Sequence, residues 1–180
     1  MGDLIIPTSI VTAVTQEEAT ELARIATGKT VLELGAYHGF STVVLASVAE
    51  RVISVDWHQG DDHAGRGDTW DIFISNLRQY GVADKVTVCR GRFEDEVPRL
   101  AAQGIQVDGA FIDGMHDLAS IDRDLALALM LVKPGGFVGF HDYGRCTENG
   151  YPGFEVTQAG DRFGVDHVVG FLGWGTVPAQ

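Results

Sequence analysis

Basic residues and cysteine are both scarce in this chain of 180 residues. Its three lysines, Lys29, Lys85 and Lys133, are widely scattered, and its formal net charge is −12. Because no Lys/Arg cluster is present to neutralise phosphates, we expect no nucleic-acid partner. The two cysteines, Cys89 and Cys146, form neither a disulfide framework nor a zinc pattern, so we expect a reducing, cytoplasmic location.

Long apolar runs and targeting signals are missing from the sequence as well. No apolar run reaches the length of a membrane span, and the N-terminal MGDLIIPTSIVTAV lacks the basic segment of a signal peptide. We therefore expect no membrane partner. Proline is scarce, with 5 residues, whereas the 23 glycines suit a domain with many strand-to-helix turns. A hydrophobic fraction of 45% is enough for one domain with a sizeable core.

Apolar runs alternate with amphipathic segments along most of the chain. Residues 15–28, TQEEATELARIATG, predict a helix that Thr15 caps together with Glu18. Strands are then predicted at residues 30–34, 51–56, 85–91, 107–113 and 135–142, and helices at 41–50, 69–81, 94–103 and 118–132. This alternation predicts an α/β fold with a doubly wound, Rossmann-like, mostly parallel sheet.

The last part of the chain departs from this rhythm. Residues 152–164 predict a weak helix, and residues 165–178 predict two strands that meet near Gly173. We expect these strands to add an antiparallel C-terminal edge, which makes the sheet seven-stranded. The whole chain, 1–180, is then one domain, whose residues 1–28 form a short helical cap.

The stretch VLELGAYHGFST, residues 31–42, places Glu33, Gly35 and Gly39 around the end of the first strand. Glycine there lets the backbone approach a ligand and lets the next helix begin close to it. Asp56 ends the second strand, where a carboxylate accepts both hydroxyls of a ribose. The combination predicts an adenosine-type ligand. The GxxxG spacing leaves less room for a pyrophosphate than GxGxxG does, which disfavours the alternative of a nicotinamide oxidoreductase.

Polar residues also end the fourth and fifth predicted strands. Asp113 lies in FIDGMH, and His141 and Asp142 begin HDYG, so all three should face the same crevice as Gly35. Carboxylates there either bind a divalent cation or orient a base. His116 is the candidate general base because imidazole titrates near neutrality; the alternative is that it only begins the next helix.

Other polar residues are assigned no chemistry. His58 and His63 lie in the polar segment 57–68, which is too long for a simple connector, and we expect them to be solvated. Asp122 and Asp124 are read as one solvated helix face, with Asp124 the better candidate for holding a neighbour. Cys89 is read as a buried strand residue.

Over residues 15–143 the chain resembles class I S-adenosylmethionine-dependent methyltransferases. VLELGAYHGFSTVVLA is similar to motif I of catechol O-methyltransferase-like enzymes, in which ELGAYxGYS is characteristic. The resemblance implies that S-adenosylmethionine is the cofactor and that Asp56 holds its ribose. It also implies that the methionine end is lined by Glu33, Gly35, Tyr37 and Ser41, and the adenine by Trp57, Phe93 and Glu94.

The resemblance further implies a divalent cation, such as Mg²⁺ or Mn²⁺. In catechol O-methyltransferase-like enzymes the ligands are the fourth-strand aspartate and an Asp-Asn pair; Asp113 and Asp142 match, and Tyr143 stands at the asparagine. Macrocin-type sugar O-methyltransferases and cephalosporin-hydroxylase-like proteins have an acidic pair there, whose first member is replaced by His141. The implied ligands are Asp113, His141 and Asp142, and the histidine shifts preference from Mg²⁺ towards Mn²⁺, Zn²⁺ or Fe²⁺.

The expected activity is methyl transfer from S-adenosylmethionine to a hydroxyl of a small molecule, such as a sugar or polyketide glycoside. The alternative is a non-catalytic protein of the same fold that binds S-adenosylmethionine without turnover. The sequence does not identify the acceptor. Its specificity would come from residues 57–68 and 143–163, or from a neighbouring subunit of a homodimer.

Overall fold

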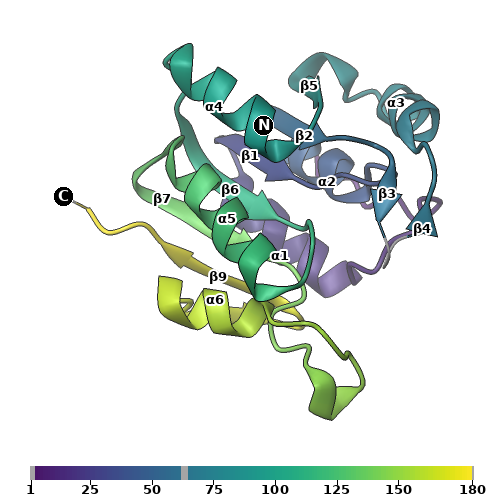
Figure 1. Ribbon diagram of the computed structural model, residues 1–180. Coiled ribbons are helices and arrows are strands. Elements are labelled where there is room, and N and C mark those ends of the chain that lie inside the picture. Colours follow the sequence, from purple (N-terminus) through teal and green to yellow (C-terminus); the bar gives the residue numbers. More distant parts are fainter. Residues whose placement is uncertain (1–2, 62–64, 180) are drawn as a thin grey trace.

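Seven strands form one sheet in the computed structural model, which describes residues 3–61 and 65–179 (Figure 1). Their spatial order is β5-β2-β1-β6-β7-β9-β8, and the pairs from β5 to β7 are parallel whereas β7, β9 and β8 pair antiparallel. The strands are β1 (Thr30–Leu34), β2 (Arg51–Asp56), β5 (Val86–Arg90), β6 (Val107–Ile112), β7 (Val132–Phe140), β8 (His167–Val169) and β9 (Leu172–Thr176). The predicted fold class, with its antiparallel C-terminal edge, is confirmed.

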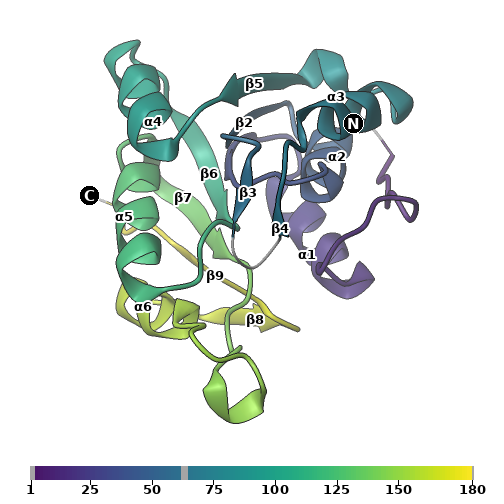
Figure 2. The same cartoon turned by 45° about the vertical axis from the view of Figure 1, so that its right-hand side comes forward.

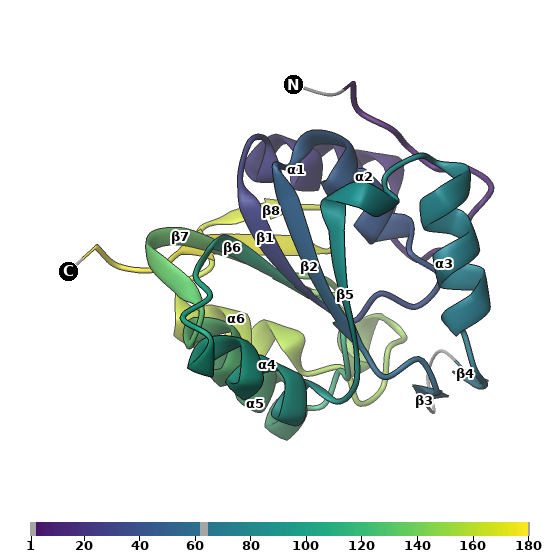
Figure 3. The same cartoon turned by 90° about the horizontal axis from the view of Figure 1, so that it is seen from above.

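Helices cover both faces of the sheet, as Figure 3 shows from above. One layer consists of α1 (Gln16–Ala26), α2 (Phe40–Val48) and α3 (Trp70–Gln79), and the other of α4 (Phe93–Ala102), α5 (Leu118–Leu129) and α6 (Val156–Phe163). Two 3₁₀ turns, Ala83–Lys85 and Thr147–Asn149, complete the described helical segments. Strand order reverses at β1, which places a ligand crevice at the carboxyl ends of β1 and its neighbours.

Burial on both faces explains why the central strands are continuous apolar runs. In β1, Val31 packs into the core beneath α1 and α2, while Leu32 and Leu34 pack into the core beneath α4 and α5. Each fully buried aliphatic side chain of this kind contributes about 1.5–3 kcal/mol. Every residue of α2 is buried, as expected for an apolar helix flanked by α1 and α3.

Helix α1 begins with the predicted capping box. The Glu18 backbone N–H donates to Thr15 Oγ1 at 3.3 Å, and the Thr15 N–H donates to Glu18 Oε2 at 2.7 Å. Glu18 is nevertheless 1% exposed, although a capping residue needs no burial to satisfy the first turn.

The boundary between α5 and β7 differs from the prediction. The helix ends at Leu129, and the strand begins at Val132, which pairs with Val107. The ladder then shifts register, so that Gly109 pairs with Phe137 and the residues between Val132 and Phe137 bulge outward. Residues 133–136, a lysine, a proline and two glycines, interrupt the apolar run of β7. A prediction based on apolar runs therefore begins the strand too late.

Strands β8 and β9 lie side by side as a C-terminal hairpin (Figure 2). The hairpin turns at Gly170 and Phe171 rather than near Gly173. Gly170 has φ 58°, the left-handed conformation that a tight turn requires. Gly173 lies inside β9, where a Cβ would come within 2.6 Å of Tyr143 Cγ. Glycine is therefore required at this position because the Tyr143 ring packs on it, and not because the chain turns there.

The polar segment 57–68 contains a short antiparallel ladder between β3 (Gly60–Asp61) and β4 (Gly65–Arg66). The expectation that His58 is solvated is wrong: it is 1% exposed, its Nδ1 is 2.9 Å from Thr69 Oγ1, and its ring packs on Phe73. His63 lies outside the described residues. Among the described helices, none is both long and apolar enough to cross a bilayer.

Candidate active site

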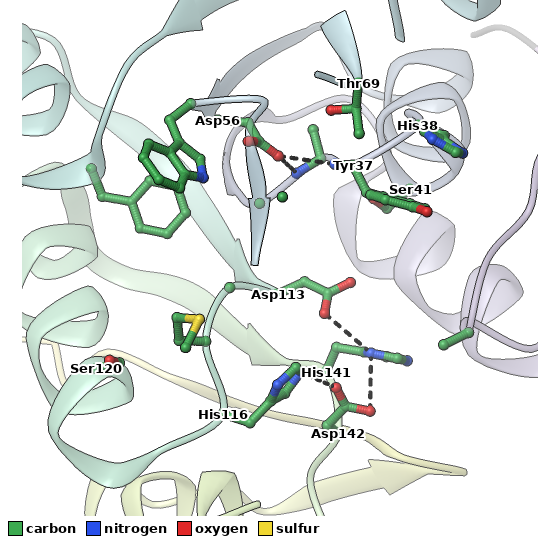
Figure 4. A pocket seen from close by; sticks show the side chains of 18 of the residues that line it. Tyr37, His38, Ser41, Asp56, Thr69, Asp113, His116, Ser120, His141 and Asp142 are labelled. Carbon is green, nitrogen blue, oxygen red and sulfur yellow. Dashed lines mark hydrogen bonds and ion pairs between the residues drawn. The ribbon is translucent and has the colours of Figure 1, made fainter. Parts of the chain in front are cut away.

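A cavity of ≈ 1110 Å³ opens at the carboxyl ends of the parallel strands. Figure 4 shows Tyr37, Ser41 and Asp56 on one side, His116, His141 and Asp142 on the other, and Asp113 between them. Small-molecule sites typically occupy roughly 300–1,000 Å³, so this cavity has room for a cofactor and an acceptor together. Of the predicted site residues, all except Glu33 and Gly39 line it.

The glycine turn after β1 shapes one wall. Gly35 has φ 94°, and a Cβ there would lie 2.1 Å from the Asp113 carbonyl oxygen, so only glycine lets the ends of β1 and β6 meet so closely. Gly39, with φ 89°, caps α2 and faces Phe73, 3.0 Å from where its Cβ would be. Gly39 thus shapes the turn from behind the cavity.

Asp56 binds the same turn. Its Oδ2 accepts the N–H groups of Ala36 and Tyr37 at 2.8 and 2.9 Å, and its Oδ1 accepts the N–H of His58 at 2.7 Å. The carboxylate therefore holds the turn and also faces the cavity, where the remaining lone pair of Oδ1 can accept a ligand hydroxyl.

Glu33 lies beneath the turn and not in the cavity, which corrects its predicted place among the lining residues. Its carboxylate accepts hydrogen bonds from Ser41, Thr42 and Ser54 at 2.6–2.7 Å. Burial raises the pKa of Glu33 to about 7, against the opposing effect of the three hydroxyl donors. Glu33 therefore fixes the hydroxyl of Ser41, which does line the cavity.

The residues expected beside an adenine lie together at another wall. Trp57 is 40% exposed, and the Arg92 guanidinium stacks 4.4 Å from its ring centroid. Phe93 and Glu94 begin α4 and also line the cavity. A Cβ on Gly114 would lie 2.9 Å from Phe93 Cε2, so the chain after β6 packs directly on this ring.

Asp124 supports that wall from inside the protein, and the expectation that it lies on a solvated face is wrong. It is 0% exposed, and its Oδ1 accepts from the Arg123 guanidinium at 3.0 Å. Its Oδ2 has no hydrogen-bond partner among the described residues and lies 3.1 Å from the ideal Cβ position of Gly114. Burial raises the pKa of Asp124 to about 6.

A cluster of carboxylates surrounds His141 at the opposite wall. Its Nδ1 lies 3.3 Å from Asp113 Oδ1 and 3.4 Å from Asp142 Oδ1 (Figure 4). Its Nε2 lies 3.5 Å from Glu18 Oε2. Burial alone would lower the pKa of His141, but these carboxylates together raise it to about 12. The position strongly favours a positive charge, whether carried by the ring or by a bound cation.

Asp142 is contacted by two further basic side chains. His116 Nε2 is 2.7 Å from its Oδ2, and Arg145 Nη1 is 2.6 Å from its Oδ1. Although burial opposes ionisation, the contacts with His116 and His141 hold the pKa of Asp142 well below its usual range. The His116 ring stacks on Phe154 at 4.1 Å, so its orientation is defined on two sides.

Asp113, His141 and Asp142 fit a divalent cation by their chemistry and spacing. One ligand atom from each lies within 4.8 Å of the others. The contacts of His141 with Asp113 and Asp142, at 3.3 and 3.4 Å, are longer than charge-assisted hydrogen bonds, which are about 2.7–2.9 Å. Tyr143 is turned away: its hydroxyl donates to Asp161 Oδ1 at 2.6 Å.

Several cavity residues were missed by the sequence analysis. Residues 11–14 line the cavity ahead of α1, and no pattern in this short apolar segment indicates it. Arg145 and Phe154 belong to the tail from which acceptor specificity was expected, but their individual roles had no sequence signal. Gln59, Gly60, Arg66 and Gly67 bring the segment 57–68 to the cavity as well.

This fold and site define a Rossmann-like, class I methyltransferase. Residues 32–143, more than half of the chain, match the family described as Methyltransferase domain, and the chain belongs to that family. The predicted enzyme class, an S-adenosylmethionine-dependent methyltransferase, is thereby confirmed. No curated protein is significantly similar to this chain in sequence.

Solved structures share the fold at low sequence identity. Cofactor-bound Rv0187 from MTB is 22% identical with a TM-score of 0.70, over 97% of this chain and 84% of that one. TomG from Streptomyces achromogenes, an O-methyltransferase of tomaymycin synthesis in complex with SAM, is 23% identical with a TM-score of 0.71, over 96% and 83%. An O-methyltransferase from Bacillus cereus in complex with SAH is 23% identical with a TM-score of 0.60, over 78% and 61%.

Proposed function

We propose that the chain transfers the methyl group of S-adenosylmethionine to a hydroxyl of a small molecule, with a divalent cation held by Asp113, His141 and Asp142. The observation that carries this proposal is the 2.7 Å contact between His116 Nε2 and Asp142 Oδ2 at the cavity wall. An imidazole held by a carboxylate is the arrangement that a hydroxyl acceptor needs for deprotonation. The O-methyltransferases among the structural relatives support the same reaction type.

The donor would lie along the glycine turn. Asp56 would accept a ribose hydroxyl, Trp57 and Phe93 would pack on its adenine, and the amino end of α2 with Ser41 would receive its carboxylate. His116, on the facing side of the cavity, would then meet the acceptor. Most of the acceleration would come from aligning donor and acceptor for an in-line displacement.

In the reaction the acceptor oxygen forms a bond to the methyl carbon while the methyl–sulfur bond breaks, which leaves S-adenosylhomocysteine. His116 takes the hydroxyl proton, and Asp142 orients the ring and stabilises the positive charge that develops on it. When bound, the cation would acidify and orient the hydroxyl. Arg145 lies 4.6 and 4.5 Å from the ring centroids of Tyr151 and Phe171, which meet edge to face, and its Nη1 holds Asp142 Oδ1 at 2.6 Å.

The test is transfer of a labelled methyl group to a panel of phenols, catechols and glycosides, with and without prior chelation. We expect product, loss of activity on chelation, and recovery with Mn²⁺ or Mg²⁺. The His116→Gln variant should lower kcat by about 10²–10⁴-fold and leave donor affinity nearly unchanged, because His116 faces the acceptor. His167→Gln is the control, since that side chain is 55% exposed beside β9.

The outcomes separate the alternatives. Donor binding without product across the panel would favour the non-catalytic S-adenosylmethionine-binding protein. Full activity after chelation would show that the reaction needs no cation, and His116 would then be the only proposed means of activating the hydroxyl. A His116→Gln variant with wild-type turnover would show that His116 is not the general base. The small hydroxylated acceptor, a homodimer, and the lack of nucleic-acid and membrane partners stay predictions.

A further inference from the structure

Glu18 has an environment that helix capping does not require. It lies in the first turn of α1, yet its side chain is 1% exposed. Its Oε1 accepts the backbone N–H of Phe171 at 2.6 Å, across 153 residues of sequence. Its Oε2 accepts the Thr15 N–H at 2.7 Å and also lies 3.5 Å from His141 Nε2.

The turn between β8 and β9 packs against this carboxylate. A Cβ on Gly170 would lie 2.4 Å from Glu18 Oε1, so the turn leaves no space for another side chain there. Glu18 is therefore a buried carboxylate held by α1, by the hairpin turn and by the residue that follows β7.

The two ring nitrogens of His141 face different partners. Nε2 faces Glu18, whereas Nδ1 faces Asp113 Oδ1 and Asp142 Oδ1 in the candidate cation site. A histidine that binds a metal through one nitrogen donates the N–H of the other to a carboxylate or carbonyl, and this second contact decides which nitrogen is available. Glu18 stands where that second carboxylate belongs.

We propose that Glu18 is a positioning residue, which holds the Nε2–H of His141 and so presents Nδ1 to a divalent cation shared with Asp113 and Asp142. This inference rests on the cation of the proposed function. It adds that one carboxylate, held by the N-terminal helix and the C-terminal hairpin, sets the metal affinity of a site at the carboxyl ends of β6 and β7. Glu18 lies behind His141 and is absent from the cavity wall.

The test measures Mn²⁺ binding to the full chain by electron paramagnetic resonance of the free ion, with no turnover involved. Loss of a carboxylate behind a metal-binding histidine typically lowers metal affinity 10–100-fold, and we expect that loss in Glu18→Gln. Glu17→Gln is the matched control, because Glu17 is the exposed neighbour on the same helical turn. Binding is measured below the unfolding temperature of each variant; if Glu18→Gln does not fold, Glu18→Asp, which keeps the charge but withdraws it from Nε2, replaces it.

Pulsed electron paramagnetic resonance of the bound Mn²⁺ then tests whether the ring of His141 is a ligand. The wild type should show coupling to a directly bound imidazole nitrogen, and the Glu18 variant should show this coupling weakened or lost. In a His141→Ala background the Glu18 substitution should cause no further loss of affinity, because no ring is left to position.

Each outcome decides a different statement. A wild type that does not bind Mn²⁺ would overturn the cation and the role of Glu18 together. Unchanged affinity in Glu18→Gln, with binding in the wild type, would overturn only the role of Glu18. An equal loss in the His141→Ala background would also overturn it, since Glu18 would then act through the fold alone.

Discussion

The pKa values of two buried glutamates, Glu18 and Glu33, shift in opposite directions because different donors face them. Glu18 meets two backbone N–H groups and the His141 ring, and its pKa falls to about 2. Glu33 meets only neutral hydroxyls and the field of Asp113, so burial dominates and raises its pKa to about 7. Burial therefore has no fixed consequence for a carboxylate; the charge of its partners decides.

Glu33 should make stability depend on pH near neutrality. Its pKa is 4.5 in the unfolded chain and about 7 in the folded protein, so its contribution is fully present below pH 4.5 and is lost as pH rises through 7. Relative to Glu33→Gln, the wild type should lose roughly 3 kcal/mol of unfolding free energy between these pH values. Urea unfolding of both proteins from pH 4.5 to 8 measures the difference.

The other titrating groups, including His141, are present in both proteins, so their contributions to the pH dependence of the unfolding free energy cancel in the difference. Glu17→Gln, an exposed site, should show a pH-independent difference from the wild type. A constant difference for Glu33→Gln as well would mean that folding does not raise the pKa of Glu33.

At the scale of the element, the turn between β1 and α2 lies between Asp56 and Asp113 at the cavity. Gly35 donates its N–H to Val55 at 3.0 Å, and Asp113 donates its N–H to Leu34 at 2.8 Å, so β2, β1 and β6 end at the same level. This level positions Asp56 and Asp113 on opposite sides of one turn. A change in the turn is therefore expected to affect binding and stability together.

Gly35→Ala tests this connection. The new Cβ would meet the Asp113 carbonyl oxygen at 2.1 Å, and the φ of 94° is strained for alanine, so we expect a loss of at least about 1–3 kcal/mol in stability and weaker donor binding. Gly104→Ala is the control, since Gly104 has φ +73° and nothing within 4 Å of its Cβ position. Denaturant unfolding and calorimetry with S-adenosylhomocysteine give the two readouts. Equal effects of the two substitutions would show that backbone strain alone matters and that the contact with Asp113 does not.

At the scale of the whole molecule, the cavity is formed by segments from both ends of the chain. Residues 11–14 lie ahead of α1, and Phe154 lies just ahead of α6, yet both line the cavity that the parallel strands create. Ligand binding should therefore stabilise the molecule as a unit.

S-adenosylhomocysteine should raise the melting temperature of the wild type. At a concentration 100-fold above its Kd, linkage contributes about 2.7 kcal/mol, which corresponds to roughly 5–10 °C for a domain of this size. Differential scanning fluorimetry measures the shift, and NADH is the control ligand, with no shift expected. A shift with NADH and none with S-adenosylhomocysteine would contradict the assignment of the adenosine-type site.

Periodicity and the positions of strand ends predicted most of the fold and the polar residues that the strand ends contribute to the candidate site. Gly35, Asp56, Asp113 and Asp142 were predicted to share a crevice because parallel strands end at one edge of a sheet, and the structure brings all four to the cavity. That inference needs only the element order, which apolar runs and capping residues encode locally.

Tertiary packing alone decided what lies behind those residues. Glu18 looked like a helix cap, and His58 and Asp124 like surface groups, because a polar residue type carries no local sign of the segment that will cover it. The Phe171 N–H that Glu18 binds lies 153 residues away, and the register shift in β7 depends on its pairing with β6. The sequence by itself determined the sheet, the cofactor turn and the acidic strand ends, since these follow from neighbours in the chain. Some partners that set the charge and orientation of His141 and Glu33 come from other elements, namely Glu18 and Asp113 at His141 and Ser54 at Glu33, so only the folded structure could supply them.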